Sequence, residues 1–230
     1  MIHETSGTEE TSARTAPGRT EPAPAPARPA VAGEPLVAGL LLAAGGGRRL
    51  GGRPKALLSH RGRPLVEHAV RVLREGGCEV VHVVLGAAAD RVRAEARLPG
   101  CVLVDNPEWA EGMGSSLRAG LASLEAEALP VEAALVSLVD QPGIGAAAVA
   151  RVREAYRGPG SLAAASYEGR RGHPVLFGAD RWAGIAAGAV GDQGARDYLK
   201  EHGDAITLVD CSDVAEPYDI DTEADLVHLE

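Results

Sequence analysis

The sequence predicts an α/β protein in which helices cover both faces of a mostly parallel sheet. From residue 35 onward, short apolar segments alternate with longer segments that carry an apolar face at helical spacing. The segment 133–139 is apolar almost throughout, which is typical of a central strand that is buried on both faces. With 230 residues, the chain is long enough for one domain with a single core.

Each expected strand is a short apolar run that ends at glycine, proline or polar residues. The expected strands are 37–42, 79–85, 101–105, 133–139, 162–167, 174–177 and 205–209. The connection between 162–167 and 174–177 is short and contains glycine, so we expect these two strands to form an antiparallel hairpin.

Each expected helix places apolar residues on one face, and proline, serine or glycine marks several helix ends. Pro64 starts the first helix, which ends before Gly76. Ser115 or Ser116 is expected to cap the helix that continues through Leu124. Further helices are expected at 87–97, at 144–156, in the segment that ends at Lys200, and after Thr222. Thr222 is expected to cap the last of these, with Asp225 in the capping-box position.

Composition limits the classes of function. The net charge of -9 disfavours nonspecific binding to nucleic acid or to an anionic membrane, and no apolar run approaches the ~18 residues of a membrane span. Cys78, Cys101 and Cys211 form no Cys-x-x-Cys pair and indicate reduced thiols in strands of a cytoplasmic protein. Residues 1–34 are rich in Pro, Ala and Glu, so we expect a disordered tail before a domain over 35–230.

A glycine-rich segment with basic residues follows the first expected strand. It begins with five small residues, Ala43, Ala44, Gly45, Gly46 and Gly47. Arg49 and Lys55 follow, and their charges suit phosphate groups. Glycine also lets backbone N–H groups approach an anion closely. We therefore predict a phosphate-binding loop rather than a flexible surface turn.

This segment matches neither of two common phosphate-binding motifs. The dinucleotide fingerprint needs a third glycine where this chain has Leu50. No Gly-Lys-Ser/Thr of a P-loop is present. The predicted loop therefore belongs to a different class of nucleotide or phosphate site.

Carboxylates elsewhere in the chain are expected at the same edge of the sheet. Asp140 follows the strand 133–139, and open α/β sheets bind ligands at the carboxyl ends of their strands. Asp219 and Asp221 lie in one extended segment, and we expect only one of them to point into the site. Mg²⁺ prefers one or two carboxylates together with phosphate oxygens. A basic loop with these carboxylates predicts nucleotidyl transfer, in which an acceptor phosphate attacks the α-phosphate and pyrophosphate leaves.

Two further segments are weaker candidates for ligand contacts. His173 lies at the return of the expected hairpin, and we expect it to shape a substrate site rather than to act as an acid or base. The segment from Gly191 to Arg196 is either a second ligand loop or a solvated turn.

Over residues 36–230, these segments resemble, in order, the signature motifs of MobA-like nucleotidyltransferases. The matching motifs are Leu42-Ala-Ala-Gly45-x-Gly47-x-Arg49-Leu50-Gly51 with Pro54-Lys55, Asn106-Pro-x-Trp109-x-x-Gly112-Met113-x-x-Ser115/Ser116, Asp140-Gln141-Pro142, Gly172-His173-Pro174-Val-Leu-Phe177, Gly191-Asp192-x-Gly194-Ala-Arg196 and Asp219-Ile-Asp221-Thr222. The Asp-Gln-Pro and Gly-His-Pro elements most resemble molybdenum cofactor cytidylyltransferases. Close relatives often carry one glycine before Arg-Pro-Lys, whereas this chain carries Gly51 and Gly52.

The resemblance implies a three-layer α/β/α sandwich with a Rossmann-like sheet, of the nucleotide-diphospho-sugar transferase type. It also implies transfer of CMP from CTP to the molybdenum–molybdopterin cofactor, with Mg²⁺ and with release of pyrophosphate. By position, Arg49 and Lys55 would hold the triphosphate, and residues 43–47 would wrap the nucleotide.

The same resemblance implies roles for residues beyond the glycine loop. Asp140 would bind Mg²⁺, with Asp219 or Asp221 as the second carboxylate. The residues implied near the acceptor phosphate are Ser115, Ser116, His173 and Arg196.

Three other interpretations stay open. The chain could transfer GMP or another nucleotide to molybdopterin or a sugar phosphate, although guanylyl-transferring relatives usually carry Leu-Ala-Gly-Gly where this chain has Leu42-Ala-Ala-Gly45. Some relatives have an oxidoreductase role on nicotine blue, and the missing dinucleotide fingerprint weighs against that role. A chaperone could deliver the cofactor to a xanthine-dehydrogenase-type molybdoenzyme without catalysis, but Lys55 and the carboxylates favour activity.

Overall fold

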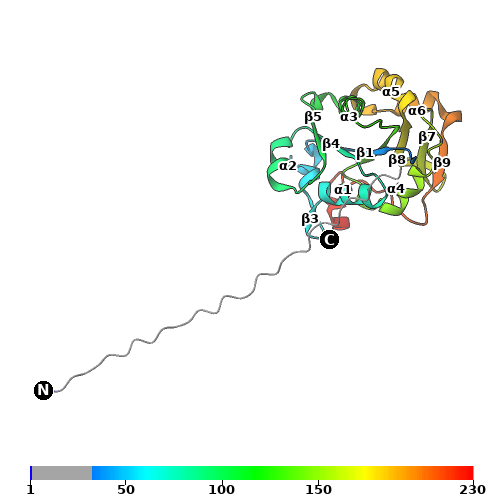
Figure 1. Cartoon of the computed structure of the whole chain (residues 1–230). Helices are drawn as coiled ribbons and strands as arrows, with labels where there is room; N and C mark the ends of the chain where they lie inside the picture. The colour runs from blue at the N-terminus through cyan, green and yellow to red at the C-terminus, as the bar shows by residue number, and fades with distance from the viewer. Residues whose placement is uncertain (2–32, 230) are drawn as a thin grey trace. The chain divides into compact units, whose positions relative to one another are not determined.

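A computed structural model of the chain describes Met1 and residues 33–229. These residues form a central seven-stranded sheet with helices on both faces (Figure 1). The predicted α/β fold class is therefore confirmed. The tail predicted over residues 1–34 lies almost wholly outside the described residues and stays a prediction.

The sheet has the strand order β5-β4-β1-β6-β8-β7-β9. Its strands are β1 (Val37–Ala43), β4 (Val81–Leu85), β5 (Val102–Asp105), β6 (Ala133–Leu138), β7 (Leu162–Tyr167), β8 (Arg170–Gly178) and β9 (Thr207–Asp210). All neighbours are parallel except β8, which runs antiparallel to both β6 and β7. The predicted β7–β8 hairpin is confirmed, and its connection is a tight turn at Glu168 and Gly169, which both have positive φ.

Helices cover the two faces of the sheet unequally. The helices are α1 (Leu65–Glu75), α2 (Ala89–Glu95), α3 (Met113–Glu125), α4 (Ala146–Arg153), α5 (Trp182–Gly188) and α6 (Arg196–Glu201). In Figure 1, α1 and α4 lie on one face, and α3, α5 and α6 lie on the other. The observed layers are those of an α/β/α sandwich.

Alternation along β1 explains why both faces of the sheet are apolar. Leu41 faces the core on the side of α1, whereas Leu40 and Leu42 face the core on the side of α3. Gly120 lets α3 approach this strand, because a Cβ at residue 120 would lie only 2.5 Å from Leu40 Cδ1. A strand that is buried on both faces is thus held at the centre of the sheet.

The predicted serine cap of α3 is wrong. The helix begins at Met113, Gly112 occupies the cap position, and no side chain caps the helix. Ser115 and Ser116 lie inside the first turn and are buried. Their hydroxyls bond to Asn106 instead, which is a tertiary contact that local sequence does not reveal.

The closing segment is helical, as predicted. The helix expected after Thr222 is present as a 3₁₀ helix over Glu223–Leu229. One half of the expected capping box is present, because Asp225 Oδ2 accepts from the Thr222 backbone N–H at 2.6 Å, while the Thr222 hydroxyl donates to the same oxygen at 2.8 Å.

A small second sheet was not predicted from the sequence. Strands β2 (Ser59–His60) and β3 (Arg63–Pro64) form a two-residue hairpin at Arg61 and Gly62, where φ is 50° and 77°. Positive φ at both turn residues is the geometry that short hairpins favour.

Two further expectations concern the location of the cysteines in strands and the lack of a membrane-spanning segment. All three cysteines are free, but they lie just outside the strands rather than within them. Among the described residues, no helix combines the length and the apolar character that crossing a membrane requires.

Candidate active site

The glycine loop folds into a compact turn directly after β1. Gly47 adopts the left-handed conformation, and its carbonyl accepts hydrogen bonds from Leu50 N and Gly52 N at 2.9 and 3.0 Å. Arg48–Leu50 form a 3₁₀ turn that ends at Gly51. Gly51 and Gly52 have φ of 66° and 80°, which side-chain-bearing residues rarely adopt. The doubled glycine is therefore part of the turn that leads the chain toward Lys55.

Replacement of Gly47 by alanine is expected to destabilise this loop. Its φ of 62° is unfavourable for alanine, and the added Cβ would lie 1.8 Å from the Arg53 carbonyl oxygen. We expect the free energy of unfolding to fall by about 2 kcal/mol or more, measured by urea denaturation. Gly45→Ala is the matched control, because a Cβ at residue 45 has no neighbour within 4 Å. Equal stability of the two variants would contradict this account of the loop.

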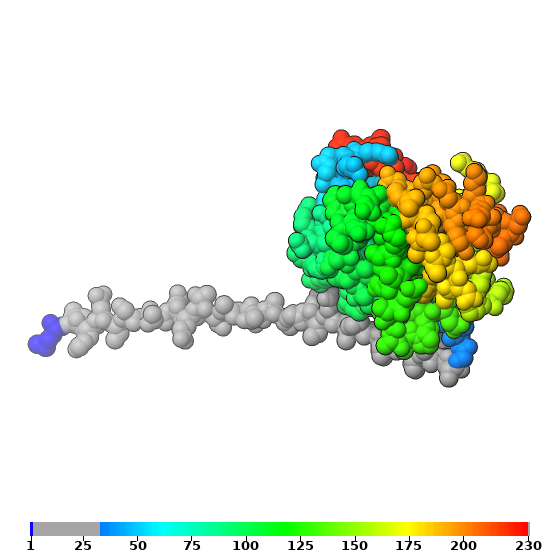
Figure 2. Space-filling model, turned by 90° about the horizontal axis from the view of Figure 1, so that it is seen from above, coloured from blue at the N-terminus to red at the C-terminus, as the bar shows by residue number. Residues whose placement is uncertain are grey.

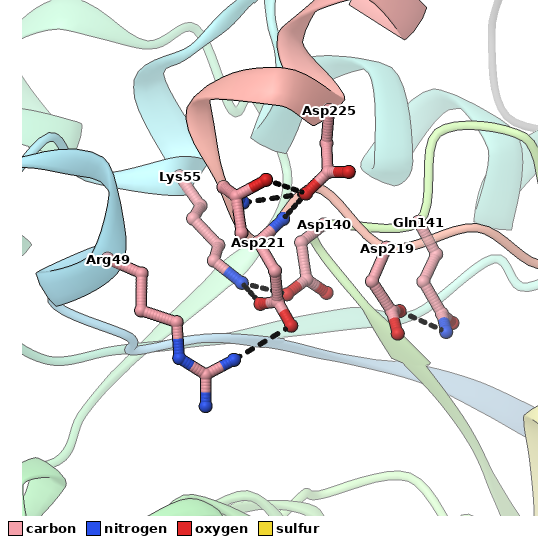
Figure 3. Close-up of polar contacts among 8 residues, drawn as sticks. Arg49, Lys55, Asp140, Gln141, Asp219, Asp221 and Asp225 are labelled. Atoms are coloured by element: carbon pink, nitrogen blue, oxygen red, sulfur yellow. Dashed lines mark hydrogen bonds and ion pairs between the residues drawn. The ribbon is translucent and has the colours of Figure 1, made fainter.

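Lys55 lies between two carboxylates at the carboxyl ends of the central strands. Its Nζ donates to Asp140 Oδ2 at 2.6 Å and to Asp221 Oδ1 at 2.5 Å (Figure 3). The Lys55 and Asp140 side chains are only 16% and 18% exposed, whereas Asp221 is 41% exposed. The structure thus brings together three of the predicted site residues, from segments up to 166 positions apart.

Backbone pairing holds the 219–221 segment beside Asp140. The Ile220 N–H donates to the Asp140 carbonyl at 2.9 Å, and the Ile220 side chain is fully buried. Asp219 and Asp221 consequently lie on the other side of the chain together (Figure 3). Residues two apart share one side of an extended segment, so the alternation that we expected from the sequence is wrong, although only Asp221 contacts Lys55.

The two aspartates of this segment have different partners. Asp221 contacts Lys55, and its Oδ2 also accepts from Arg49 Nη1 at 3.2 Å. Asp219 Oδ1 instead accepts from Gln141 Nε2 at 2.8 Å. Burial raises the pKa of Asp219, and the charges of Asp140 and Asp221 add to this effect, although the Gln141 bond opposes it. Asp221 is therefore the stronger candidate for a second metal-binding carboxylate.

Electrostatics keep Lys55 charged. Burial alone would lower its pKa, but the charges of Asp140 and Asp221 and their hydrogen bonds together raise the pKa above its ordinary value. A permanently charged ammonium at this position suits the binding and neutralisation of phosphate oxygens.

Basic residues of the loop also bind the C-terminal segment. Arg53 Nη2 donates to Glu223 Oε1 at 3.0 Å, and Arg49 reaches Asp221. Figure 2 shows the C-terminal segment, in red, against the cyan part of the chain that follows the loop. Arg49 is 75% exposed, so its guanidinium can turn toward a ligand at little cost.

The carboxylates fit a divalent cation. Asp140 and Asp221 already converge on one positive charge, and carboxylate oxygens are the ligands that Mg²⁺ prefers. Across residues 33–229, no cluster of three or more His, Cys, Asp or Glu side chains is arranged to hold a metal by itself. A two-carboxylate site that is completed by a ligand's phosphate oxygens agrees with both observations.

A cleft of about 910 Å³ lies next to this cluster. Asp219 and Gln141 line its near end, and His173 and Arg196 also line it. Apolar side chains contribute much of the remaining wall, among them Leu42, Leu117, Val136, Leu138, Val175 and Phe177. The size is typical of small-molecule sites, and the wall suits one face of a flat ring.

His173 is held as a neutral side chain. Its pKa is lowered to about 4, mainly by burial; the charge of Asp140 opposes this effect, and the charge of Arg171 adds to it. The His173 carbonyl accepts from the Tyr167 hydroxyl at 2.7 Å. A neutral imidazole in the wall of the cleft agrees with the predicted role in shaping the site.

Stability is expected to decline in mild acid because of two half-buried histidines. His173 and His68 both have a pKa of about 4 in the fold, against 6.5 ordinarily, and burial is the main cause. Between these values the unfolded chain binds protons that the folded chain does not, so the free energy of unfolding falls as the pH falls. Urea denaturation across this range should show the decline, and it should be shallower for His173→Gln. A stability that is constant across the range would contradict the prediction.

Ser115 and Ser116 do not face the cleft. Both hydroxyls accept from Asn106 Nδ2, at 2.9 and 3.0 Å, and the Ser115 hydroxyl also contacts the Glu108 and Gly112 carbonyls. The serines therefore hold the segment before α3 in place, and the structure does not bring them to the other predicted acceptor residues.

Several residues near the site were not singled out from the sequence. The cleft is also lined by Arg170 and Arg171, and Asp225 fixes the backbone at Asp221. The Arg-Arg pair beside Gly172 is a charge signal that was visible in the sequence. The Asp225 contact with Asp221 follows from the capping arrangement, which the sequence did predict.

Comparison with known proteins gives a family match over most of the described chain. The family model described as the MobA-like NTP transferase domain matches residues 39–206. Nicotine blue oxidoreductase of Paenarthrobacter nicotinovorans is 43% identical over 202 residues, which cover 85% of this chain and 97% of that protein.

Two further proteins show partial or structural similarity. A molybdenum cofactor guanylyltransferase of Pseudomonas fluorescens (strain SBW25) is 33% identical over 118 residues, which cover 51% of this chain and 54% of that protein. The structure of Rv0371c from Mycobacterium tuberculosis H37Rv, in complex with manganese, is 27% identical with a TM-score of 0.66. That similarity covers 85% of this chain and 97% of the Rv0371c chain.

Proposed function

The chain belongs to the MobA-like NTP transferase domain family, and we propose that it transfers CMP from CTP to a molybdopterin-type acceptor. The observation that carries this proposal is the placement of Lys55 between Asp140 and Asp221, at the exit of the glycine loop. A loop for the triphosphate, a buried cation and paired carboxylates are the parts that nucleotidyl transfer needs.

The proposed reaction is an in-line displacement at phosphorus. An oxygen of the acceptor's phosphate forms a bond to the α-phosphorus of CTP, and the bond from that phosphorus to the β-phosphate oxygen breaks. Pyrophosphate leaves with the electron pair of the broken bond. Lys55 and Arg49 neutralise the charge that develops on the phosphate oxygens, and the loop positions the triphosphate.

Asp140 and Asp221 would hold Mg²⁺ in this proposal. The ion supplies charge neutralisation and orientation of the triphosphate when it is bound. Their convergence on one cation supports this assignment, as does the manganese complex of Rv0371c. Asp219 is assigned to the cleft rather than to the metal, because it contacts Gln141 and not Lys55.

The cleft supports a large, partly flat acceptor. Its volume of about 910 Å³ and its apolar wall accommodate a ring system, and Arg170, Arg171 and Arg196 supply positive charge for an anionic arm. A molybdopterin has both features, whereas a sugar phosphate lacks the flat ring. The proposed acceptor residues are therefore those of the cleft.

The choice of CTP depends on the loop sequence. Ala44 stands where guanylyl-transferring relatives usually carry glycine, and this favours cytidine. The partial similarity to a molybdenum cofactor guanylyltransferase makes GTP the first alternative nucleotide. An enzyme that modifies molybdopterin would pass its product to a molybdoenzyme, and a xanthine-dehydrogenase-type enzyme is the proposed recipient.

A second candidate function is reduction of a pigment such as nicotine blue. The 43% identity to a nicotine blue oxidoreductase is the observation that favours it. The loop after β1 lacks the dinucleotide fingerprint, so a nicotinamide cofactor would need another mode of binding. Lys55 is of a residue type that binds phosphate, and Asp140 and Asp221 are of a residue type that binds metal ions. We therefore propose nucleotidyl transfer as the first candidate function.

Pyrophosphate release tests the proposal. The full chain is incubated with Mg²⁺, molybdopterin cofactor and, in turn, CTP, GTP or ATP. Release with CTP at a rate at least about tenfold above that with GTP is expected. Faster release with GTP would reassign the nucleotide. Inactivity with all three, together with NAD(P)H-dependent bleaching of nicotine blue, would establish the reductase instead.

A further inference from the structure

Lys55 occupies the position that a metal ion would need. The proposed function assigns Mg²⁺ to Asp140 and Asp221, and one oxygen of each carboxylate, Asp140 Oδ2 and Asp221 Oδ1, accepts from Lys55 Nζ. The contacts are 2.6 and 2.5 Å long, and the Lys55 side chain is only 16% exposed. The ammonium is therefore enclosed between the carboxylates rather than resting on the surface beside them.

An ammonium and a metal ion exclude each other at this position. Mg²⁺ binds oxygen at about 2.0–2.1 Å, so an ion held by the same two oxygens would lie where Nζ lies now. If Lys55 stayed in place, its ammonium and the metal ion would be in direct contact, and their positive charges would repel strongly in a partly buried site. The other oxygen of Asp221 accepts from Arg49 at 3.2 Å, so both oxygens of this carboxylate contact basic groups.

A triphosphate is the ligand that can remove Lys55 from this position. Lys55 follows the glycine loop at the start of a 3₁₀ turn, and it carries its charge on a flexible side chain. A nucleotide in the loop would bring several negative charges to Lys55 and to exposed Arg49 together. The carboxylates that the two basic groups leave would then become available to a metal ion.

We infer that Lys55 is a displaceable counter-ion that closes the metal site until a nucleoside triphosphate is bound. Metal binding and nucleotide binding are consequently coupled, and the free protein has low affinity for divalent metal. The inference depends on the proposed function for two points, namely that Asp140 and Asp221 are metal ligands and that the glycine loop binds a nucleoside triphosphate.

Binding of Mn²⁺ without nucleotide tests the inference. The free Mn²⁺ signal is followed by electron paramagnetic resonance as the ion is titrated into the full chain. Lys55→Met removes the competing charge, so we expect its Mn²⁺ affinity to exceed that of the wild type by at least about tenfold, within the usual range of site-to-site coupling. Lys55→Gln, which is neutral but polar, is expected to show the same gain. Lys200→Met is the matched control, because Lys200 is the only other lysine in the chain and is exposed.

The outcomes separate this inference from the proposed function. Unchanged Mn²⁺ affinity in both Lys55 variants would overturn the inference, and so would a gain that persists after Asp140→Asn is added to Lys55→Met. Neither measurement requires turnover. A protein that releases no pyrophosphate, yet gains Mn²⁺ affinity on loss of Lys55, would refute the transferase proposal and leave the inference standing.

Discussion

Replacement of Lys55 by methionine is expected to reduce pyrophosphate release from CTP by about 10²–10³-fold, which is the usual cost of removing one preorganised charge at a reacting phosphate or oxyanion. Lys55 is the most enclosed cation of the site, and its raised pKa keeps it charged. Initial rates of pyrophosphate release at saturating CTP and acceptor measure the effect, with Lys200→Met as the control. Unaltered turnover would contradict the assigned role.

Arginine at position 55 is not expected to restore activity. The present ammonium meets two carboxylate oxygens at 2.6 and 2.5 Å in a confined space, and a planar guanidinium is too large for that geometry. Only two of the 23 basic residues in the chain are lysine, and Lys55 is one of the two. The lysine at this position is therefore an exception in a chain that otherwise mostly uses arginine. Restoration of full turnover by Lys55→Arg would show that charge alone is sufficient at this position.

The elements that local patterns specify were predicted well. The apolar run 133–139 became β6, and the periodic segment after Pro64 became α1 with its end at the predicted glycines. The rule that ligands bind at the carboxyl ends of parallel strands correctly placed Asp140 beside the basic loop. In each case the physical signal lies within a few residues or follows from sheet topology.

The errors arose where a distant residue decides the outcome. Serine is a residue type that often caps helices, but the Ser115 hydroxyl accepts a hydrogen bond from Asn106, and Gly112 occupies the cap position. The pairing of Asp221 with Lys55 depends on the backbone bond from Ile220 to Asp140, which joins segments 80 positions apart (220 minus 140). No local pattern carries that information, so the partners of Asp219 and Asp221 became known only from the structure.

Replacement of Asp140 by asparagine is expected to reduce Mg²⁺-dependent pyrophosphate release by at least about 100-fold while the fold persists. Asparagine keeps the shape of the side chain but removes the charge that Lys55 and a metal ion both need. Lys55 would retain Asp221 as a partner, so the stability cost should stay at roughly 1–3 kcal/mol. Circular dichroism and urea denaturation check the fold, and Asp204→Asn, at an exposed position, is the control.

Comparison with Asp219→Asn makes this prediction specific to the metal site. Asp219 contacts Gln141 and lines the cleft, so its loss is expected to raise KM for the acceptor and to leave Mn²⁺ affinity in the Lys55→Met background unchanged. Asp140→Asn is expected to abolish that affinity and to lower kcat. If the two variants instead behaved alike in both measurements, Asp219 would belong to the metal site as much as Asp140 does. Full turnover by Asp140→Asn with Mg²⁺ present would refute the assignment of Asp140 as a metal ligand.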